Sequence, residues 1–239
     1  MIDIHCHLLP GIDDGPASME EALKLAEISS RSGITRAVAT PHIHHGRYGN
    51  DKNRIRNSFD GFSKELRKRG IPLLLGFSAE VRIGPEILPM IERDEIPFLG
   101  EIEGCNVMLL EFPHGHIPMG SERLAKWLLA RKIIPMIAHP ERNKDVIREP
   151  GRIMPFVRMG CMLQVTAGSV AGLFGGQAQK TSHHLLKEGL VFALASDAHN
   201  ANHRPPELEP GRRCAERIVG ESFSWNLVYR NPLSLLLNE

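Results

Sequence analysis

Histidine and carboxylate side chains follow directly after several short apolar runs of this chain. His5 and His7 come after Ile2–Ile4, and further candidates follow five later runs: His42, Glu80, Glu111, His139, and Asp197 with His199. If the runs are neighbouring parallel strands, their C-terminal ends open on one face, and these side chains gather there. So many buried imidazoles and carboxylates are too costly to desolvate unless a cation neutralises them. The spacing therefore predicts a metalloenzyme.

The His5-Cys6-His7 segment is a weak signal by itself and a stronger one at the end of a strand. Side chains alternate along a strand, so both imidazoles should point one way while Cys6 points to the helix layer. Among the histidines after the second run, His42 lies nearest the strand and is the predicted ligand. His44 and His45 are expected on a rim that meets substrate.

The Asp13-Asp14-Gly15-Pro16 segment has the composition of a turn, so Asp14 is either a ligand or a residue of an Asx turn. Histidine and oxygen ligands without sulfur suit Mn²⁺, Fe²⁺ or Zn²⁺, and spacing does not choose among them. Shared carboxylates would let this set hold two or three ions. The chain has four scattered cysteines, Cys6, Cys105, Cys161 and Cys214, and no C-x-x-C pair. This pattern argues against a zinc-thiolate site and against a disulfide framework.

Two arginines, Arg142 and Arg204, each stand a few residues beyond a candidate ligand. A cation beside a metal cluster is unfavourable unless an anion lies between them, and a guanidinium group binds phosphate or carboxylate through paired donors. Each arginine alone could equally form a surface ion pair. Together they favour phosphoester chemistry over amide hydrolysis.

The elements that must position these residues alternate between strands and helices. A capping box, Ser18-x-x-Glu21, starts the first helix, and a second helix should run from about Asp51 to Lys68. Seven strand candidates arise, of which the sixth, Met162–Val165, contributes no obvious ligand. Later helices are expected at 84–92, 121–130, 145–159, 169–187 and 207–219. Ligands spread over six strands favour an α/β barrel of parallel strands, with the metal site at the C-terminal strand ends, over an open sheet.

Length and composition indicate one domain, residues 1–239, because the chain is long enough for one substantial core and short for two. The net charge of +1 gives no field that attracts nucleic acid. No apolar run reaches the roughly 18 residues that a membrane span needs, and the first strand starts at once, which leaves no room for a signal peptide. A cytoplasmic location is therefore expected, without direct membrane insertion. A homo-oligomer remains possible.

Taken together, these residues resemble the polymerase-and-histidinol-phosphatase (PHP) family of metal-dependent phosphoesterases. The resemblance is closest to the bacterial, manganese-dependent protein-tyrosine phosphatases of capsule and exopolysaccharide clusters. It spans essentially the whole chain and is carried by these motifs: D-I-H-C-H-L-L-P-G-I-D-D-G-P at 3–16, T-P-H at 40–42, G-F-S-A-E at 76–80, L-L-E-F at 109–112, I-A-H-P-E-R at 137–142, A-S-D-A-H-N at 195–200 and R-P-P at 204–206.

The resemblance implies a trinuclear site in a distorted, TIM-like seven-stranded α/β barrel, with Mn the foremost metal and Fe or Zn as alternatives. One ion would be held by His5, His7, Glu80 and Asp197; a second by Glu80, Glu111 and His139; and a third by Asp14, His42 and His199. Arg142 and Arg204 would match the phosphate-binding arginines. The segments around 44–56 and 114–116 carry no such match.

The resulting hypothesis is a metal-dependent protein-tyrosine phosphatase, whose implied partner is an autophosphorylated bacterial tyrosine kinase of polysaccharide export. The nearest rival is a small-molecule phosphatase of the histidinol-phosphate type. A second rival is an amidohydrolase, although no lysine follows any expected strand as a bridging ligand would. A third is an inactive metal-binding module, which the complete ligand set disfavours.

Overall fold

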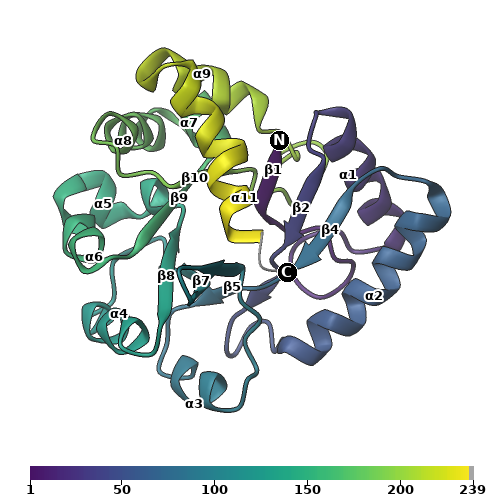
Figure 1. The fold of residues 1–239 in the computed structure, drawn as a ribbon, viewed down its shortest axis with the longest axis horizontal. Helices are drawn as coiled ribbons and strands as arrows, with labels where there is room; N and C mark the ends of the chain where they lie inside the picture. Colours follow the sequence, from purple (N-terminus) through teal and green to yellow (C-terminus); the bar gives the residue numbers. More distant parts are fainter. Residues whose placement is uncertain (237–239) are drawn as a thin grey trace.

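The computed structural model describes residues 1–236 of the chain. Parallel strands form a central ring that helices surround, as Figure 1 shows. The strands are β1 (Ile2–Cys6), β2 (Arg36–Ala39), β3 (His42–Ile43), β4 (Leu74–Phe77), β5 (Glu80–Arg82), β6 (Gly100–Ile102), β7 (Cys105–Glu111), β8 (Ile133–Ala138), β9 (Met162–Thr166) and β10 (Ala193–Ala195). The expected α/β fold of TIM-like type is confirmed.

Two sheets share this ring, with strand orders β1-β2-β4 and β10-β9-β8-β7-β5-β3. They meet where β2 continues into β3 and β4 into β5, because the ladder carries on through bonds from Ser78 N to Ala39 O (2.8 Å) and from Glu80 N to Pro41 O (3.1 Å). At the other end, an isolated parallel bridge joins Cys6 to Ala198. One strand departs from the expected parallel arrangement, since β6 pairs antiparallel with β7.

The helices that cover the ring are α1 (Met19–Arg31), α2 (Lys52–Arg69), α3 (Ile87–Glu92), α4 (Ser121–Leu129), α5 (Lys144–Arg148), α6 (Met154–Met159), α7 (Ala167–Ala171), α8 (Gly176–Lys187), α9 (Glu209–Val219), α10 (Glu221–Trp225) and α11 (Asn231–Leu236). Short 3-10 turns, η1 (Pro140–Arg142) and η2 (Pro150–Ile153), and a π-helical turn, η3 (Asn226–Arg230), connect some of them. The first two helices begin as predicted: Ser18 accepts a hydrogen bond from Glu21 N, and Asp51 accepts one from Arg54 N.

Two of the expected helices are wrong as single elements. The expected helix 145–159 is divided into α5, η2 and α6, because Glu149, which precedes a proline, adopts an extended backbone at φ −144°. The expected helix 169–187 is divided into α7 and α8 by the turn 172–175, where Gly172 has a φ of +95°. The helices after Val219 were not predicted.

Two apolar layers pack on the two sides of the strands. The larger layer lies between strands and helices and includes Cys6, as the predicted orientation of that side chain requires. The smaller layer joins Ile2, Ile4, Leu109 and Met136 from the strands to Leu235 of α11, so it fills the inside of the ring. In Figure 1, α11 crosses the centre of this ring. Within residues 1–236, no helix combines the length and the apolar character that crossing a bilayer requires.

Candidate metal centre

A β-bulge in β1 turns His5 into the ring. The register with β2 pairs Asp3 with Ala37 and Cys6 with Ala39, so Ile4 and His5 together face a single residue of β2. Without this extra residue, the alternation that directs Ile4 inwards would direct His5 outwards. Alternation alone predicts that His5 and His7 point the same way, whereas their inward direction depends on an irregularity that the sequence pattern does not reveal.

Two other candidate residues adopt left-handed backbone conformations where their strands end. His139, directly after β8, has a φ of +32°, and Asp197, shortly after β10, has a φ of +52°. Such values are uncommon for residues with a side chain and cluster at functional sites. They turn the chain sharply, so that both side chains remain buried at the C-terminal end of the ring.

The structure brings all nine sequence-predicted ligand residues to this end of the ring. Three sets have ligand atoms close enough to hold one ion each: His5, His7, Glu80 and Asp197; His7, Asp14, His42 and His199; and His42, Glu80 and Glu111. The first set equals the first predicted site, and the second set equals the third predicted site with His7 added. In the third set, His42 stands where His139 was predicted, and His139 Nε2 instead lies 2.7 Å from Glu80 Oε1.

Glu80 lies at the centre of the cluster. Its Oε2 atom is 3.3 Å from Nε2 of both His5 and His7 and 3.0 Å from Nδ1 of His42. Within residues 1–236, several atoms of the cluster are buried without a hydrogen-bond partner: His42 Nδ1, Glu80 Oε2, Glu111 Oε2, Asp197 Oδ1 and His199 Nε2. Buried polar atoms without partners are costly, and these five point to a shared cation. The residues therefore fit divalent metal ions.

Residues outside the predicted set orient the imidazoles. Asp13 Oδ2 lies 2.6 Å from His7 Nδ1, and Gln164 Oε1 lies 2.8 Å from His5 Nδ1. Each contact leaves the Nε2 atom of its histidine free for a metal, which is how buried oxygens commonly fix the tautomer of a ligand. Sequence reasoning missed both residues. Asp13 looked like a turn residue, and Gln164 lies on β9, the strand to which no ligand was assigned.

Arg82 is another residue that the sequence did not single out. Its Nη1 atom lies 2.7 Å from Glu111 Oε1, and its side chain is only 22% exposed. This ion pair engages Oε1 of Glu111 and leaves its Oε2 atom facing the cluster, 3.9 Å from His42 Nδ1. A signal did exist in the sequence, because Arg82 follows Glu80 by two residues and therefore shares its side of the strand.

Arg142 and Arg204 meet at the cluster, and both form ion pairs with Asp197 Oδ2. The anion between the arginines and the candidate ligands is thus a carboxylate of the cluster itself. Arg204 Nε is buried and has no hydrogen-bond partner within residues 1–236, so the guanidinium group keeps a free donor at this site. Arg142 Nη2 also lies 3.2 Å from His114 Nε2.

The segment after β3, which is predicted to meet substrate, is largely exposed. His45 is exposed and His44 is half-buried, and their segment returns through Tyr48, whose ring stacks on that of His42 at 5.5 Å between centroids. Burial, followed by the charge of Arg82, lowers the pKa of His44. Tyr48 therefore packs directly against one of the predicted ligands, a position that its sequence context did not indicate.

The charges of the cluster shift its pKa values in opposite directions. Burial lowers the pKa of His42, but Glu80 and Asp14 outweigh that effect and raise it to about 9. Burial, aided by the negative charge of Glu80, raises the pKa of Glu111 to about 7. Burial and Arg142 lower the pKa of His139 to about 3. At neutral pH without metal, His42 is therefore protonated and Glu111 is protonated in part, in places where divalent cations would otherwise supply the positive charge.

Comparison with known proteins shows the family of this chain. The model of the family described as "Capsular polysaccharide synthesis, CpsB/CapC" matches residues 1–237. The chain belongs to the CpsB/CapC family. Within it, the chain is 35% identical to tyrosine-protein phosphatase YwqE of Bacillus subtilis, over 100% of this chain and 92% of that protein. It is 36% identical to the putative tyrosine-protein phosphatase CapC of Staphylococcus aureus, over 86% of this chain and 79% of that protein.

A solved structure supports the family assignment. Its description reads "Crystal structures of YwqE from Bacillus subtilis and CpsB from Streptococcus pneumoniae, unique metal-dependent tyrosine phosphatases". The matched chain superposes with a TM-score of 0.92 at 34% identity, covering 100% of this chain and 95% of that one. An organophosphorus hydrolase from Deinococcus radiodurans matches with a TM-score of 0.57 at 16% identity, which shows that this CpsB/CapC protein shares the fold of those hydrolases.

Proposed function

We propose that this chain is a metal-dependent protein-tyrosine phosphatase. The observation that carries the proposal is the position of two partly buried arginines, Arg142 and Arg204, against three potential ion sites. Cation sites beside guanidinium groups form a receptor for a phosphoryl group, because both neutralise its equatorial oxygens. The relatives named tyrosine-protein phosphatase support the choice of substrate class.

The nine candidate ligands would hold two or three divalent ions, with Mn²⁺ as the first choice and Fe²⁺ or Zn²⁺ as alternatives: His5, His7, Asp14, His42, Glu80, Glu111, His139, Asp197 and His199. Their imidazole and carboxylate donors suit all three metals. When bound, such ions lower the pKa of a water molecule towards neutrality and polarise the phosphoryl oxygens. Asp13 and Gln164 would keep the imidazoles in the tautomer that binds metal.

The protein's own residues would bind and orient the substrate. Arg142 and Arg204 would contact the phosphoryl oxygens through the donors that do not engage Asp197, and the buried Nε of Arg204 is one such donor. The tyrosine phenolate, with a pKa of about 10, leaves more readily than an alkoxide, so a strong acid is less necessary. Burial and the charge of Arg142 lower the pKa of His114, which disfavours that side chain as the proton donor.

The substrate is then a phosphotyrosine-bearing protein, and an autophosphorylated bacterial tyrosine kinase of capsule or exopolysaccharide synthesis is the proposed partner. The family description, which refers to capsular polysaccharide synthesis, supports this partner. A cytoplasmic location would suit the four cysteines, all of which are free thiols.

A panel of substrates tests this function. Metal-loaded protein is assayed on a phosphotyrosine peptide, a phosphoserine peptide of the same sequence, histidinol phosphate and a cyclic imide, each before and after treatment with chelator. The proposal expects turnover to be fastest on the phosphotyrosine peptide and to disappear with the metal. Faster turnover of histidinol phosphate would indicate the small-molecule phosphatase, and activity on the imide alone would indicate an amidohydrolase. Turnover that persists without metal would refute the mechanism.

A further inference from the structure

A four-residue turn, Gly172-Leu173-Phe174-Gly175, carries two large apolar side chains beside the arginine pair. The turn connects α7, which directly follows β9, to α8. Gly172 and Gly175 have φ values of +95° and +87°, and the Leu173 N–H donates to Gly168 O at 2.8 Å. The turn is therefore a defined structure whose glycines permit two sharp reversals of the chain. They leave the two side chains between them at its tip.

Phe174 contacts the proposed phosphate-binding group. The Arg142 guanidinium carbon lies 4.6 Å from the centre of the phenyl ring, within the range of a cation–π contact. Gly168 leaves room for this ring, because a Cβ atom at that position would lie 2.9 Å from Phe174 Cε2 and 3.3 Å from Leu173 Cδ1. The ring is thus fixed by α7 on one side and by Arg142 on another.

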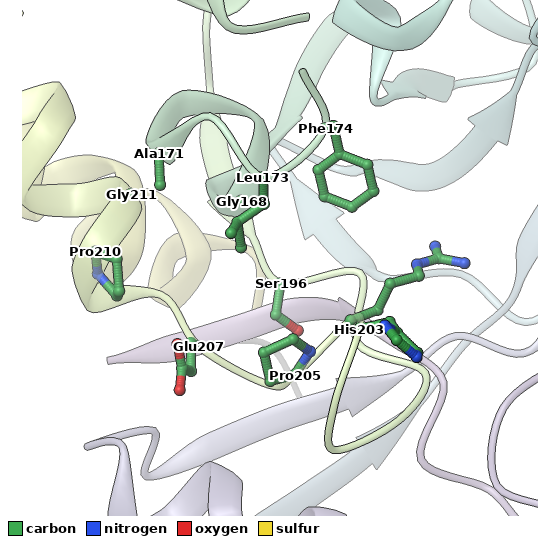
Figure 2. A pocket seen from close by; sticks show the side chains of 11 residues that line it. Gly168, Ala171, Leu173, Phe174, Ser196, His203, Pro205, Glu207, Pro210 and Gly211 are labelled. Carbon is green, nitrogen blue, oxygen red and sulfur yellow. The ribbon is translucent and has the colours of Figure 1, made fainter. Parts of the chain in front are cut away.

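Leu173 is 65% exposed, and Phe174 is half-buried. Both line a pocket that Arg204 and Pro205 also line. Figure 2 shows Leu173 and Phe174 on one side of this pocket, and Ser196, His203 and Pro205 on the other. Apolar surface exposed to water is unfavourable. Because this surface adjoins Arg142 and Arg204, a ligand with an apolar group next to a phosphate would cover it.

We propose that Leu173 and Phe174 form the aryl subsite of this phosphatase, contacting the phenyl ring of phosphotyrosine while the arginines hold its phosphate. The inference rests on the proposed function and adds to it the residues that select an aryl ester. A phosphoserine side chain has no ring to reach the turn. The subsite therefore favours aryl over alkyl phosphates, and an aromatic contact of this kind is worth about tenfold in affinity.

Two phosphonates that resist hydrolysis separate binding of the ring from binding of the phosphate. The dissociation constants of phenylphosphonate and methylphosphonate are measured calorimetrically on metal-loaded wild-type protein and on Leu173→Ala, Phe174→Ala and Phe174→Tyr. Wild-type protein should bind the phenyl compound about tenfold more tightly. Phe174→Ala should remove most of that preference and leave methylphosphonate binding unchanged, Phe174→Tyr should retain it, and Leu173→Ala should reduce it.

Matched controls come from other exposed apolar residues. Leu74 is 64% exposed where β4 begins, at the opposite end of the ring from the cluster, and Phe223 is 66% exposed on α10. Leu74→Ala and Phe223→Ala should keep the phenyl preference. The proposal is wrong if Phe174→Ala weakens both phosphonates equally, since the ring would then only support Arg142. It is also wrong if the preference is absent in wild-type protein or unchanged in Phe174→Ala.

Kinetics provide a second readout. For Phe174→Ala, kcat/KM on the phosphotyrosine peptide should fall about tenfold, mostly through KM, and change less than about threefold on the matched phosphoserine peptide. An equal loss on both peptides would refute the aryl subsite while leaving the proposed phosphatase intact. If the wild-type protein hydrolyses no phosphotyrosine, the proposed function itself fails, whatever the phosphonates show.

Discussion

The two ends of the strand ring are built from the same strands but filled with opposite kinds of side chain. Towards the N-terminal ends, Ile2, Val107 and Met136 belong to the apolar layer inside the ring. A few residues further along the same strands, His5, Glu111 and His139 are equally buried. The apolar end is stable by packing alone, whereas the polar end needs positive charge to offset the desolvation of its carboxylates. Along these strands, the residues that stabilise the fold by packing therefore lie towards the N-terminal end, and the candidate ligands lie at the C-terminal end.

The largest effect expected from this contrast comes from Glu80, which contacts three histidines through one oxygen. Glu80→Gln should reduce phosphotyrosine turnover by about a thousandfold or more, because a shared metal ligand is lost. Metal content measured by elemental analysis should fall with it.

Ile2, at the N-terminal end of β1, supplies the matched change in the apolar layer inside the ring. Ile2→Ala should lower the free energy of unfolding by about 2–5 kcal/mol, measured in urea, and leave metal content and turnover of the folded fraction near wild type. If Glu80→Gln instead lost only stability, or Ile2→Ala lost metal, the division between the two ends would be incorrect.

The second effect concerns Arg204. Arg204→Ala should reduce turnover about a hundredfold or more, because a phosphate donor disappears. The amount of bound metal should stay nearly unchanged, since Arg142 still pairs with Asp197 and the other oxygen of that carboxylate still faces His5 and His7. Loss of metal in this variant would show that the arginine acts as a support of the cluster.

A third effect is on stability against pH in chelator-treated protein. The pKa of Glu111 is raised to about 7. Its contribution to the free energy of unfolding is therefore fully present below the ordinary pKa near 4.5 and is lost as pH rises through 7. The raised pKa of His42, about 9, contributes fully below 6.5 and is lost as pH rises through 9. The Tm of metal-free protein should therefore fall between pH 5 and 9 by more than that of Glu111→Gln, and added Mn²⁺ should raise Tm more at pH 8 than at pH 6. Equal slopes in the two proteins would contradict the assignment.

The smallest effect belongs to Cys6, which lies between the two histidines yet packs in the outer apolar layer. Its Sγ atom lies 3.3 Å from Val38 O. Cys6→Ser should therefore cost about 1 kcal/mol or less in denaturant unfolding and leave turnover largely intact. A well-folded but inactive Cys6→Ser protein would show that the two sides of β1 are not separate.

Much of this organisation was predictable from the sequence, because ligands that follow apolar runs need only strand order to converge. Eight of the nine candidate ligands, all except Asp14 of the turn 13–16, meet for that reason. The residues that orient them were not predictable, since Gln164 is 159 positions from His5 and no local pattern joins the two. The breaks at Pro150 and Gly172 were also missed, because helical periodicity continues through a short interruption. The bulge in β1 was missed because no local pattern marks the extra residue.

The central claim is that divalent cations hold the polar end of the ring together. Crystals of protein purified without chelator and grown with Mn²⁺, measured on both sides of the manganese absorption edge, test it most directly. The account predicts two or three anomalous peaks, each within about 2.0–2.4 Å of its His, Asp and Glu ligand atoms, with Glu80 shared between ions. Maps without such peaks, with Glu80 and Asp197 bound only to protons or to Arg142 and Arg204, would contradict it.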